Sequence, residues 1–367
     1  MSTNKNMIVS DYATAPGETL REVLFSLNMT QEVLAEHLGV TKKHVSNIIN
    51  DNVSITPDVA TKLEYVLGPS ASFWLNLSSN FQNCEAEAKQ EELIESQANW
   101  SDKFNYNDMA NKGFVAATSD KIKRTENLLR FFGFSDFNLM QKSIEKDELL
   151  AGAYRISEPE SEINKYALKA WIRQGYKEAL SIDLESFNRQ RLLDCLPDFK
   201  RVALESDPEV FIPELQKIAA SAGVAVVFVP ELKGCHVNSL TRWLSPFPKA
   251  IIQLSLRYKT NDVLWFTFFH EISHILFDHK KPFFSIAGDN QNGEEEKHAN
   301  KWSSDFLISP SNWHKYINDQ NFSSSGIVDF ADKNQIHPGI VVGRLQREKK
   351  ISYKEFTNLK VHYKWVS

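Results

Sequence analysis

Apolar side chains recur at helical spacing through the first part of the chain. Their pattern predicts four helices within residues 16–77, each with its own start or stop signal. Thr30 is placed to cap a short helix that Gly39 ends. Thr41 and Thr56 are placed to cap the next two helices. This part of the chain is therefore expected to be all-helical.

The second half of the chain mixes helical patterns with short apolar runs. Apolar, β-branched residues at 224–229 predict a buried strand, and residues 250–256 predict a second. A third strand is expected within 235–243, at the edge of the sheet. Helices are predicted at 121–132, 163–180 and 213–222, and a further long helix is predicted to be capped by Asn261 or Asp262. These elements indicate an α+β domain with a small sheet packed on helices.

The composition divides the chain into four segments. An all-helical domain is expected over residues 11–82. A linker follows over 83–118, in which residues 85–97 are rich in Glu, Ala, Lys and Gln. A helical middle region takes residues 119–203, and the α+β domain takes 204–367. The chain of 367 residues is thus predicted to be multidomain.

Charge and cysteine content narrow the function classes. The net charge of −5 excludes a generally basic nucleic-acid coat, so any DNA contact must be local. Three widely spaced cysteines form no CxxC pair, which fits a reducing compartment. No apolar segment is long enough to span a bilayer, and the polar start of the chain shows no signal peptide. We therefore expect a cytoplasmic protein with no membrane partner.

Residues 270–274 read His-Glu-Ile-Ser-His, which is a metal-binding pattern. Positions four apart lie on one face of a helix, so His270 and His274 can bind the same ion. Glu271 is offset from them and is placed to act as a general base on water beside the metal. The apolar flanks predict a buried helix, where histidines need polar partners.

A run of three glutamates at 294–296 begins the next predicted helix and offers a third ligand. Glu296 is the preferred ligand, with Glu295 and His298 as alternatives. Three protein ligands leave the open position that a catalytic zinc site needs, so the expected cofactor is Zn²⁺. An acidic run alone is more often a solvated helix start that complements the helix dipole. The combination with the buried helix and its two histidines favours zinc.

Two segments resemble the ImmA/IrrE metallopeptidase family. Residues 266–277 read FTFFHEISHILF and residues 296–310 read EKHANKWSSDFLISP, which match the family's HExxH helix and following E-x-x-A-N motif. The resemblance implies a zincin-like fold and a zinc-dependent metalloendopeptidase. It also implies that Glu271 is the general base and that the zinc ligands are His270, His274 and Glu296. Upstream segments at 227–233 and 241–259 are similar to the subgroup fused to HigA-type antitoxins.

The chain departs from that family at two positions. Ser273 stands where the family usually has glycine, and His298 stands where it often has glutamate. Neither change removes a zinc ligand, so the metal site is expected to survive.

A peptidase also needs a group that stabilises the tetrahedral oxyanion. His337, Arg344 and Arg242 are candidates, each with a structural role as the alternative. Cys235, beside His236, is placed either to approach the metal or to act as a small buried residue.

The first predicted helices carry a helix-turn-helix spacing. The pattern is Gln31-x-x-Leu34-Ala35, then Gly39-Val40-Thr41, then Val45-Ser46, in which a small residue lets the helices approach and a glycine makes the turn. The second helix is expected to hold a phosphate at its N-terminus and to reach base edges in the major groove. Its candidate DNA-binding residues are Thr41, Lys42, Lys43, His44, Ser46 and Asn47.

Residues 11–82 resemble the HigA branch of the XRE-type antitoxin regulators, on this spacing and on segments such as Pro16-Gly-Glu-Thr-Leu-Arg21 and Phe73-Trp-Leu-Asn-Leu77. The resemblance implies operator DNA, a homodimer and a cognate toxin or regulator protein as partner or substrate. Asn50-Asp51-Asn52 replaces the glycine that often follows the recognition helix in this family. Residues 15–80 hold four basic against seven acidic side chains, a net charge of −3, which favours specific over non-specific DNA contacts. The alternative is a helical domain for protein contact.

Three hypotheses follow from these motifs. The first is a transcriptional regulator or antitoxin whose zinc-peptidase-like domain cleaves or senses a protein partner. The second is a non-catalytic dimeric repressor that binds operator DNA and a toxin, with the zinc domain as a sensor or binding module. The third is a peptidase whose helix-turn-helix recognises only proteins.

Overall fold

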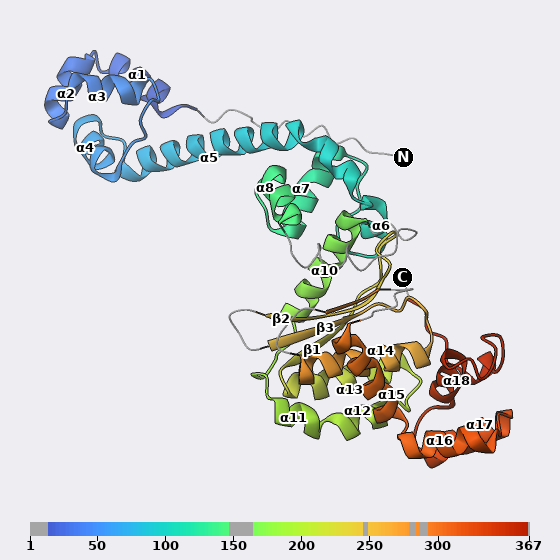
Figure 1. Cartoon of the computed structure of the whole chain (residues 1–367). Helices are drawn as coiled ribbons and strands as arrows, with labels where there is room; N and C mark the ends of the chain where they lie inside the picture. The colour runs from blue at the N-terminus through green and yellow to red at the C-terminus, as the bar shows by residue number, and fades with distance from the viewer. Residues whose placement is uncertain (1–13, 147–163, 245–248, 279–282, 287–292, 366–367) are drawn as a thin grey trace. The chain divides into compact units, whose positions relative to one another are not determined.

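The computed structural model describes residues 14–146, 164–244, 249–278, 283–286 and 293–365 (Figure 1). The chain separates into two compact units, Met1–Gln97 and Ala98–Ser367. Both are mostly helical, and the second also holds a small sheet. The expectation of a multidomain, mostly helical chain is therefore confirmed. Within the described ranges, no helix combines the length and the apolar content that crossing a membrane requires.

The N-terminal unit is all-helical, as predicted. Its helices are α1 (Pro16–Ser26), α2 (Gln31–Leu38), α3 (Lys42–Ile49), α4 (Pro57–Leu67) and α5 (Ala71–Ser96). The capping residues read from the sequence are confirmed, because Thr30, Thr41 and Thr56 each accept a hydrogen bond from the backbone N–H three residues on. Gly39 ends α2 in the left-handed conformation, with φ of 65°.

A close contact between α1 and the end of α3 fixes the α3 helix in place. A Cβ atom on Gly17 would lie 2.3 Å from the carbonyl oxygen of Ile49, so only glycine allows this approach. The Arg21 guanidinium donates to the same carbonyl at 3.1 Å, and the Gly17 N–H donates to Asp51 Oδ1 at 2.9 Å. Asp51 itself has φ of 54°, which lies in the left-handed region that glycine adopts without strain.

The second unit begins with a helical region. Its elements are η1 (Ala98–Lys103), α6 (Tyr106–Asn111), α7 (Lys121–Phe132), α8 (Phe137–Glu145) and α10 (Lys165–Leu180). Residues 98–118, which the sequence placed in a linker, bury Phe104, Tyr106 and Met109. The helix predicted at 121–132 is confirmed, and the one predicted at 163–180 is present from Lys165. Residue 163 lies outside the described residues.

The sheet has four strands, ordered β1-β3-β2-β4. They are β1 (Val224–Phe228), β2 (Val237–Leu244), β3 (Lys249–Leu254) and β4 (Phe283–Ile286). β1 runs parallel to β3, and the other two pairs are antiparallel. The expectation that the third strand lies at the edge is wrong, because β4 pairs outside β2. A run as short as β4 gives little periodicity from which to predict a strand.

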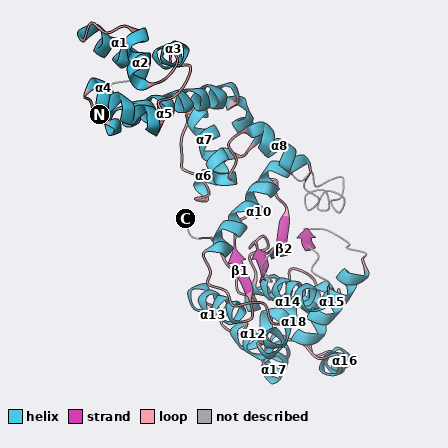
Figure 2. Ribbon diagram, turned by 90° about the vertical axis from the view of Figure 1, so that its left-hand side faces the viewer, coloured by secondary structure: helices cyan, strands magenta, loops and turns pink. Residues whose placement is uncertain are grey.

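Helices cover both faces of this sheet (Figure 2). α10 packs on one face, while α13 (Pro208–Ser221) and α14 (Asn261–Phe277) pack on the other, with α11 (Arg189–Asp194) and α12 (Leu196–Val202) nearby. The helix predicted at 213–222 begins five residues earlier, because Asp207 caps it and Pro208 fits its first turn. The capping position of α14 is Thr260, so the predicted cap, Asn261 or Asp262, is one or two residues late.

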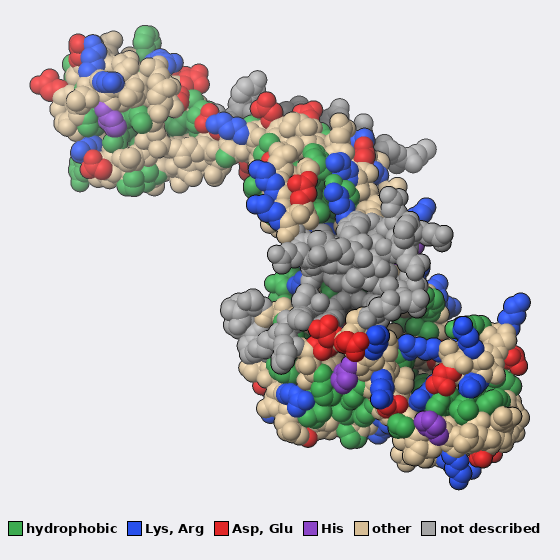
Figure 3. Space-filling model, viewed as in Figure 1, with side chains coloured by type: hydrophobic (Ala, Val, Ile, Leu, Met, Phe, Trp, Pro, Cys, Tyr) green, Lys and Arg blue, Asp and Glu red, His purple; other side chains and the backbone are tan. Residues whose placement is uncertain are grey.

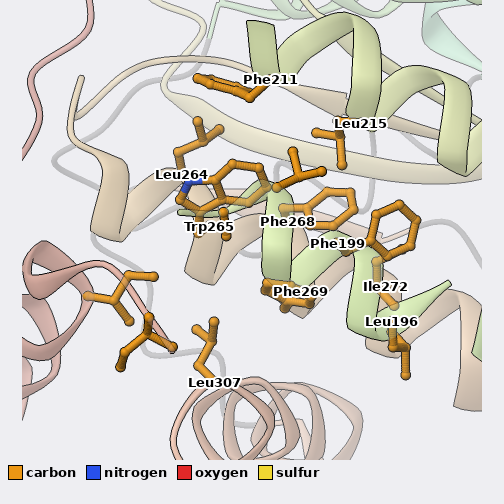
Figure 4. Close-up of a cluster of buried hydrophobic side chains, with 14 of the residues drawn as sticks. Leu196, Phe199, Phe211, Leu215, Leu264, Trp265, Phe268, Phe269, Ile272 and Leu307 are labelled. Atoms are coloured by element: carbon orange, nitrogen blue, oxygen red, sulfur yellow. The ribbon is translucent and has the colours of Figure 1, made fainter. Parts of the chain in front are cut away.

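The main hydrophobic core lies between α12, α13 and α14 and extends to α15 (Glu294–Leu307) (Figure 4). Trp265 and Phe268 of α14 meet Phe199 and Phe211, with ring centroids 5.1–5.4 Å apart for the Phe199–Phe268 and Phe211–Trp265 pairs. Such aromatic pairs supply much of the packing that holds a buried helix. The helix that carries the HExxH pattern is therefore part of the core.

The C-terminal part of the chain braces the start of α14. It contains α16 (Pro310–Asp319), α17 (Ser324–Lys333), α18 (Pro338–Arg347) and η2 (Thr357–Leu359). Lys360 Nζ lies 2.7 Å from Asp262 Oδ2, and the Val361 N–H donates to Asn261 Oδ1 at 3.1 Å. Both contacts fall on the first turn of α14, so they fix where that helix begins.

The contact at Gly17 gives a first prediction. Replacing Gly17 by alanine should destabilise the N-terminal unit by more than about 2 kcal/mol, because a methyl group cannot fit against the Ile49 carbonyl. Hydrogen exchange of the α1–α3 amides in the full-length chain measures the loss. Glu18→Ala, at the exposed neighbouring position, is the control and should cost at most about 1 kcal/mol. Equal amide protection in Gly17→Ala and the parent would contradict the close contact.

Candidate functional site

The HExxH residues lie in the middle of α14, where almost every side chain is buried. The exposed fractions of His270, Glu271 and His274 are 5%, 0% and 1%. The two histidines lie one turn apart on the same face, and their Nε2 atoms are 3.0 Å from each other. Both imidazoles therefore present a nitrogen to the same point.

Glu296, on the first turn of α15, faces that point from the opposite helix. Its Oε2 atom is 3.0 Å from His270 Nε2, and its Oε1 atom is 3.3 Å from His274 Nε2. The ligand atoms of all three residues lie within 4.8 Å of one another. Glu295 and His298, the alternatives left open by the sequence, have exposed side chains on the same helix.

Electrostatics bind the three groups together. Burial disfavours a charged imidazole, but the hydrogen bond to Glu296 and the charges of Glu271 and Glu296 outweigh it and raise the pKa of His274 to about 9. Burial alone would raise the pKa of Glu296, but hydrogen bonds and charges from the two histidines lower it to about 2. The two shifts have the same cause, because the Glu296 carboxylate and the His274 imidazole each stabilise the charged form of the other.

Asp278 is a site residue that sequence reasoning missed. It follows the last turn of α14, and its Oδ2 atom lies 2.6 Å from His274 Nδ1. A carboxylate on the far nitrogen fixes the tautomer and the orientation of a histidine, so that Nε2 of His274 faces His270 and Glu296. The spacing of four residues from His274 on a helix was the available signal.

The structure places the three candidate oxyanion groups in structural contacts. His337 caps α18 by accepting the Gly339 N–H at 3.0 Å. Arg344 donates to the carbonyl oxygens of Ser304 and Ile308, and the Arg242 guanidinium lies 4.9 Å from the Tyr176 ring centroid on α10. These contacts brace helices around the sheet.

Cys235 is a small buried residue. It is fully buried, and burial raises the pKa of its thiol to about 12. The neighbouring His236 places its Nδ1 atom 2.8 Å from the Arg257 guanidinium. A neutral thiol is a poor metal ligand, so the structure favours the packing role for Cys235.

The helix-turn-helix residues line the exposed side of α3. Thr41, Lys42 and Lys43 have exposed side chains. His44, Ser46 and Asn47 are half-buried. The opposite side of α3 is buried in the domain core through Val45, Ile48 and Ile49. The Thr41 hydroxyl already accepts the His44 N–H at 3.2 Å, so it caps the helix as well as facing outward.

Charge around this helix is mixed. Lys42 forms an ion pair with Glu32 of α2, and both side chains are more than half exposed. Figure 3 shows Lys and Arg side chains interspersed with Asp and Glu side chains on the visible face of the N-terminal unit. An exposed pair of this kind is weak and is readily exchanged for a phosphate. Lys43 is the second basic side chain at the start of α3.

Comparison with known proteins bears on this unit. A helix-turn-helix family model matches residues 19–73. An uncharacterised HTH-type transcriptional regulator, YddM of Escherichia coli, is 32% identical over 72 residues, which are 20% of this chain and 77% of that protein. Antitoxin HigA-1 of Vibrio cholerae is 45% identical over 62 residues, which are 17% of this chain and 58% of that protein.

A solved structure of the Pseudomonas aeruginosa antitoxin HigA with its higBA promoter is 32% identical and covers 23% of this chain and 94% of that chain, with a TM-score of 0.22. The relatives together account for about a fifth of the present chain. By the matched residues and the helix geometry of its N-terminal unit, the chain belongs to the helix-turn-helix transcriptional regulators and has HigA-type antitoxins among its relatives.

Proposed function

We propose that the chain is a DNA-binding transcriptional regulator of the antitoxin type whose second unit is a zincin-like, ImmA/IrrE-like zinc peptidase domain. In this proposal the domain cleaves or senses a protein partner. The observation that carries it is the convergence of His270, His274 and Glu296 on one point between α14 and α15. Nothing in the packing of a helix pair requires two imidazoles and a carboxylate to meet in this way.

The residues fit a zinc ion by their chemistry. Two imidazole nitrogens and one carboxylate oxygen form the His₂Glu set of catalytic zinc sites, which leaves a fourth position open. All three ligand residues are at least largely buried, so the ion would be shielded from bulk solvent. Asp278 supplies the outer carboxylate that metal-ligating histidines normally have.

A zinc ion in this place would polarise a peptide carbonyl and lower the pKa of a nearby water. Glu271 is the group of this chain that handles the proton. Its Oε2 atom is buried and makes no hydrogen bond to another described residue, so it is free to accept a proton from the attacking water. The apolar packing of α14 keeps bulk water away and strengthens these interactions.

The N-terminal unit supports the regulatory half of the proposal. The exposed residues of α3 are those that a helix-turn-helix presents to the major groove, and α3 is held rigidly by α1. Operator DNA is the proposed partner, read by a homodimer as helix-turn-helix proteins usually do. A cognate toxin is the proposed protein partner, on the strength of the HigA-type relatives.

A second candidate function is a non-catalytic repressor whose zinc domain senses a ligand or holds a partner. The complete burial of Glu271 favours it, because a general base must be reached by water and substrate. The two candidates share the DNA-binding unit and the metal, and they differ only in hydrolysis.

DNA binding can be tested on α3. Lys42→Ala combined with Lys43→Ala should weaken binding to the DNA upstream of the chain's own coding sequence by about 10- to 100-fold. The same change should lower the salt slope of the binding constant by about two. Lys62→Ala, which breaks a pair with Asp58 on α4, is the matched control and should leave binding unchanged. Equal affinity and salt slope in the double variant would remove α3 as the recognition helix.

Metal binding can be tested through its proton. The pKa of His274 is raised to about 9, so the metal-free chain holds this proton at pH 7, whereas a zinc ligand must be a neutral imidazole. Zinc binding at pH 7 should therefore release about one proton, and the affinity should rise about tenfold per pH unit up to about pH 9. Calorimetry in buffers of different ionisation enthalpy measures both. An affinity that does not change between pH 6 and 8 would contradict the site.

Hydrolysis separates the two candidate functions. Glu271→Gln should keep zinc with nearly unchanged affinity but slow peptide cleavage by at least about 100-fold, because the general base is lost. The measurement uses the zinc-loaded full chain and a library of unstructured peptides, read by mass spectrometry. Glu295→Gln, at an exposed neighbour of the ligand, is the control. Cleavage by Glu271→Gln at the parent rate would exclude this carboxylate as the base, and a parent that cleaves nothing favours the sensor.

A further inference from the structure

A serine on the sheet forms a hydrogen bond with the carboxylate of Glu271. Ser239 lies on β2, has no exposed surface, and donates a hydrogen bond from Oγ to Glu271 Oε1 at 2.5 Å. The two residues are 32 positions apart, so this contact exists only because β2 packs on α14. The other carboxylate oxygen, Oε2, is buried and has no hydrogen-bond partner among the described residues.

This arrangement divides the two oxygens of Glu271 between two tasks. A fully buried carboxylate is costly unless a donor satisfies it, and a hydroxyl is a small donor that fits a packed sheet–helix interface. One oxygen is thereby tied to the sheet, which fixes the rotation of the carboxylate plane. The second oxygen, Oε2, stays buried without a hydrogen-bond partner among the described residues, and Glu271 directly follows His270 on the same helix.

The backbone of β2 is shaped at this residue. β2 is bonded on both sides, by β3 and by β4, so it is a rigid support. Its pairing with β4 shifts register between Val237 and Ser239, which is the pattern of a β-bulge. Bulges re-aim a side chain at the point where they occur, and they are frequent beside active sites.

We propose that Ser239 is a positioning residue, which holds Oε1 of Glu271 so that Oε2 faces the metal centre. The inference rests on the proposed zinc site and deepens it. It adds Ser239, which lies outside the HExxH and E-x-x-A-N motifs, as a residue on which the position of the general base depends. Ser239 touches no substrate in this account and acts only through Glu271.

The chain offers a matched control on the same strand. Thr241 lies two residues along β2, on the same face as Ser239. It is fully buried, and its Oγ1 atom has no hydrogen-bond partner among the described residues. Thr241→Val removes a hydroxyl of the same kind from the same interface without touching Glu271.

The test uses the full-length chain and two small probes, zinc and acetohydroxamic acid. A hydroxamate chelates a catalytic metal and hands its hydroxyl proton to the neighbouring base, so its affinity reports the position of Glu271 without any peptide substrate. Ser239→Ala should bind zinc like the parent but bind acetohydroxamate about tenfold more weakly. Ser239→Thr, which keeps the hydroxyl, should restore the affinity, and Thr241→Val should not change it.

The effect must also run through Glu271. In a Glu271→Gln background, Ser239→Ala should cause no further loss of hydroxamate affinity, because the group it positions is already gone. A further loss of the same size in that background would overturn the inference. Loss of zinc by Ser239→Ala but not by Thr241→Val would also overturn it, because the serine would then support the ligands themselves.

Failure of this inference is distinguishable from failure of the proposed function. If the parent binds zinc and hydroxamate, and Ser239→Ala binds both equally well, the serine has no positioning role and the zinc site stands. If the parent chain binds no zinc, or binds zinc without hydroxamate, the proposed open metal site is wrong, and the role of Ser239 falls with it. Ser239→Cys, with a weaker donor of similar size, should lie between the alanine variant and the parent.

Discussion

The packing of α14 against α15 is the constraint on which the second unit depends. Phe269 meets Phe306 with ring centroids 4.9 Å apart, and Phe277 meets Trp302 at 5.8 Å. These contacts fix the rotation of both helices, and the buried Ala299 allows them to approach. Only at this rotation does Glu296 reach the two imidazoles. These aromatic contacts and the cluster of His270, His274 and Glu296 are therefore two consequences of one helix pairing.

Other parts of the chain hold α14 from its remaining sides. Strand β2 of the sheet packs against α14, and the C-terminal segment holds the first turn of α14 through the ion pair of Lys360 with Asp262. Buried ionisable groups are costly, and the four on α14 each have a partner: Asp262 has Lys360, His270 has Glu296, Glu271 has Ser239, and His274 has Asp278. A helix so fully supported holds His270 and His274 in fixed positions, as the proposed metal site requires.

Much of this organisation could be predicted from the sequence because it is local. The caps at Thr30 and Thr41, the turn at Gly39 and the spacing of His270 and His274 all depend on residues within one or two helical turns. Contacts between segments that are distant in the sequence could not be predicted in this way. The Ser239 hydroxyl spans 32 positions and the Gly17–Asp51 contact spans 34, and no local period encodes either.

The position of β2 inside the sheet shows the same limit. Tertiary packing determines which strands pair, and the hydrophobic pattern of the four β4 residues is too short to predict an extra strand. Asp51 is instructive in another way, since it takes the left-handed conformation expected of glycine and uses its carboxylate to bind the start of α1. Asp51, which stands in the segment where the family often has glycine, thus adds a hydrogen bond between the end of α3 and the start of α1.

The central claim is that α14 and α15 hold one zinc ion through two histidines and one glutamate. X-ray absorption at the zinc edge of the fully loaded chain tests it most directly. If the proposed site is right, the chain binds one zinc, with scattering from two imidazoles and oxygen neighbours at about 2.0–2.2 Å and no sulfur shell. A sulfur shell at about 2.3 Å, or bound zinc without imidazole scattering, would contradict it.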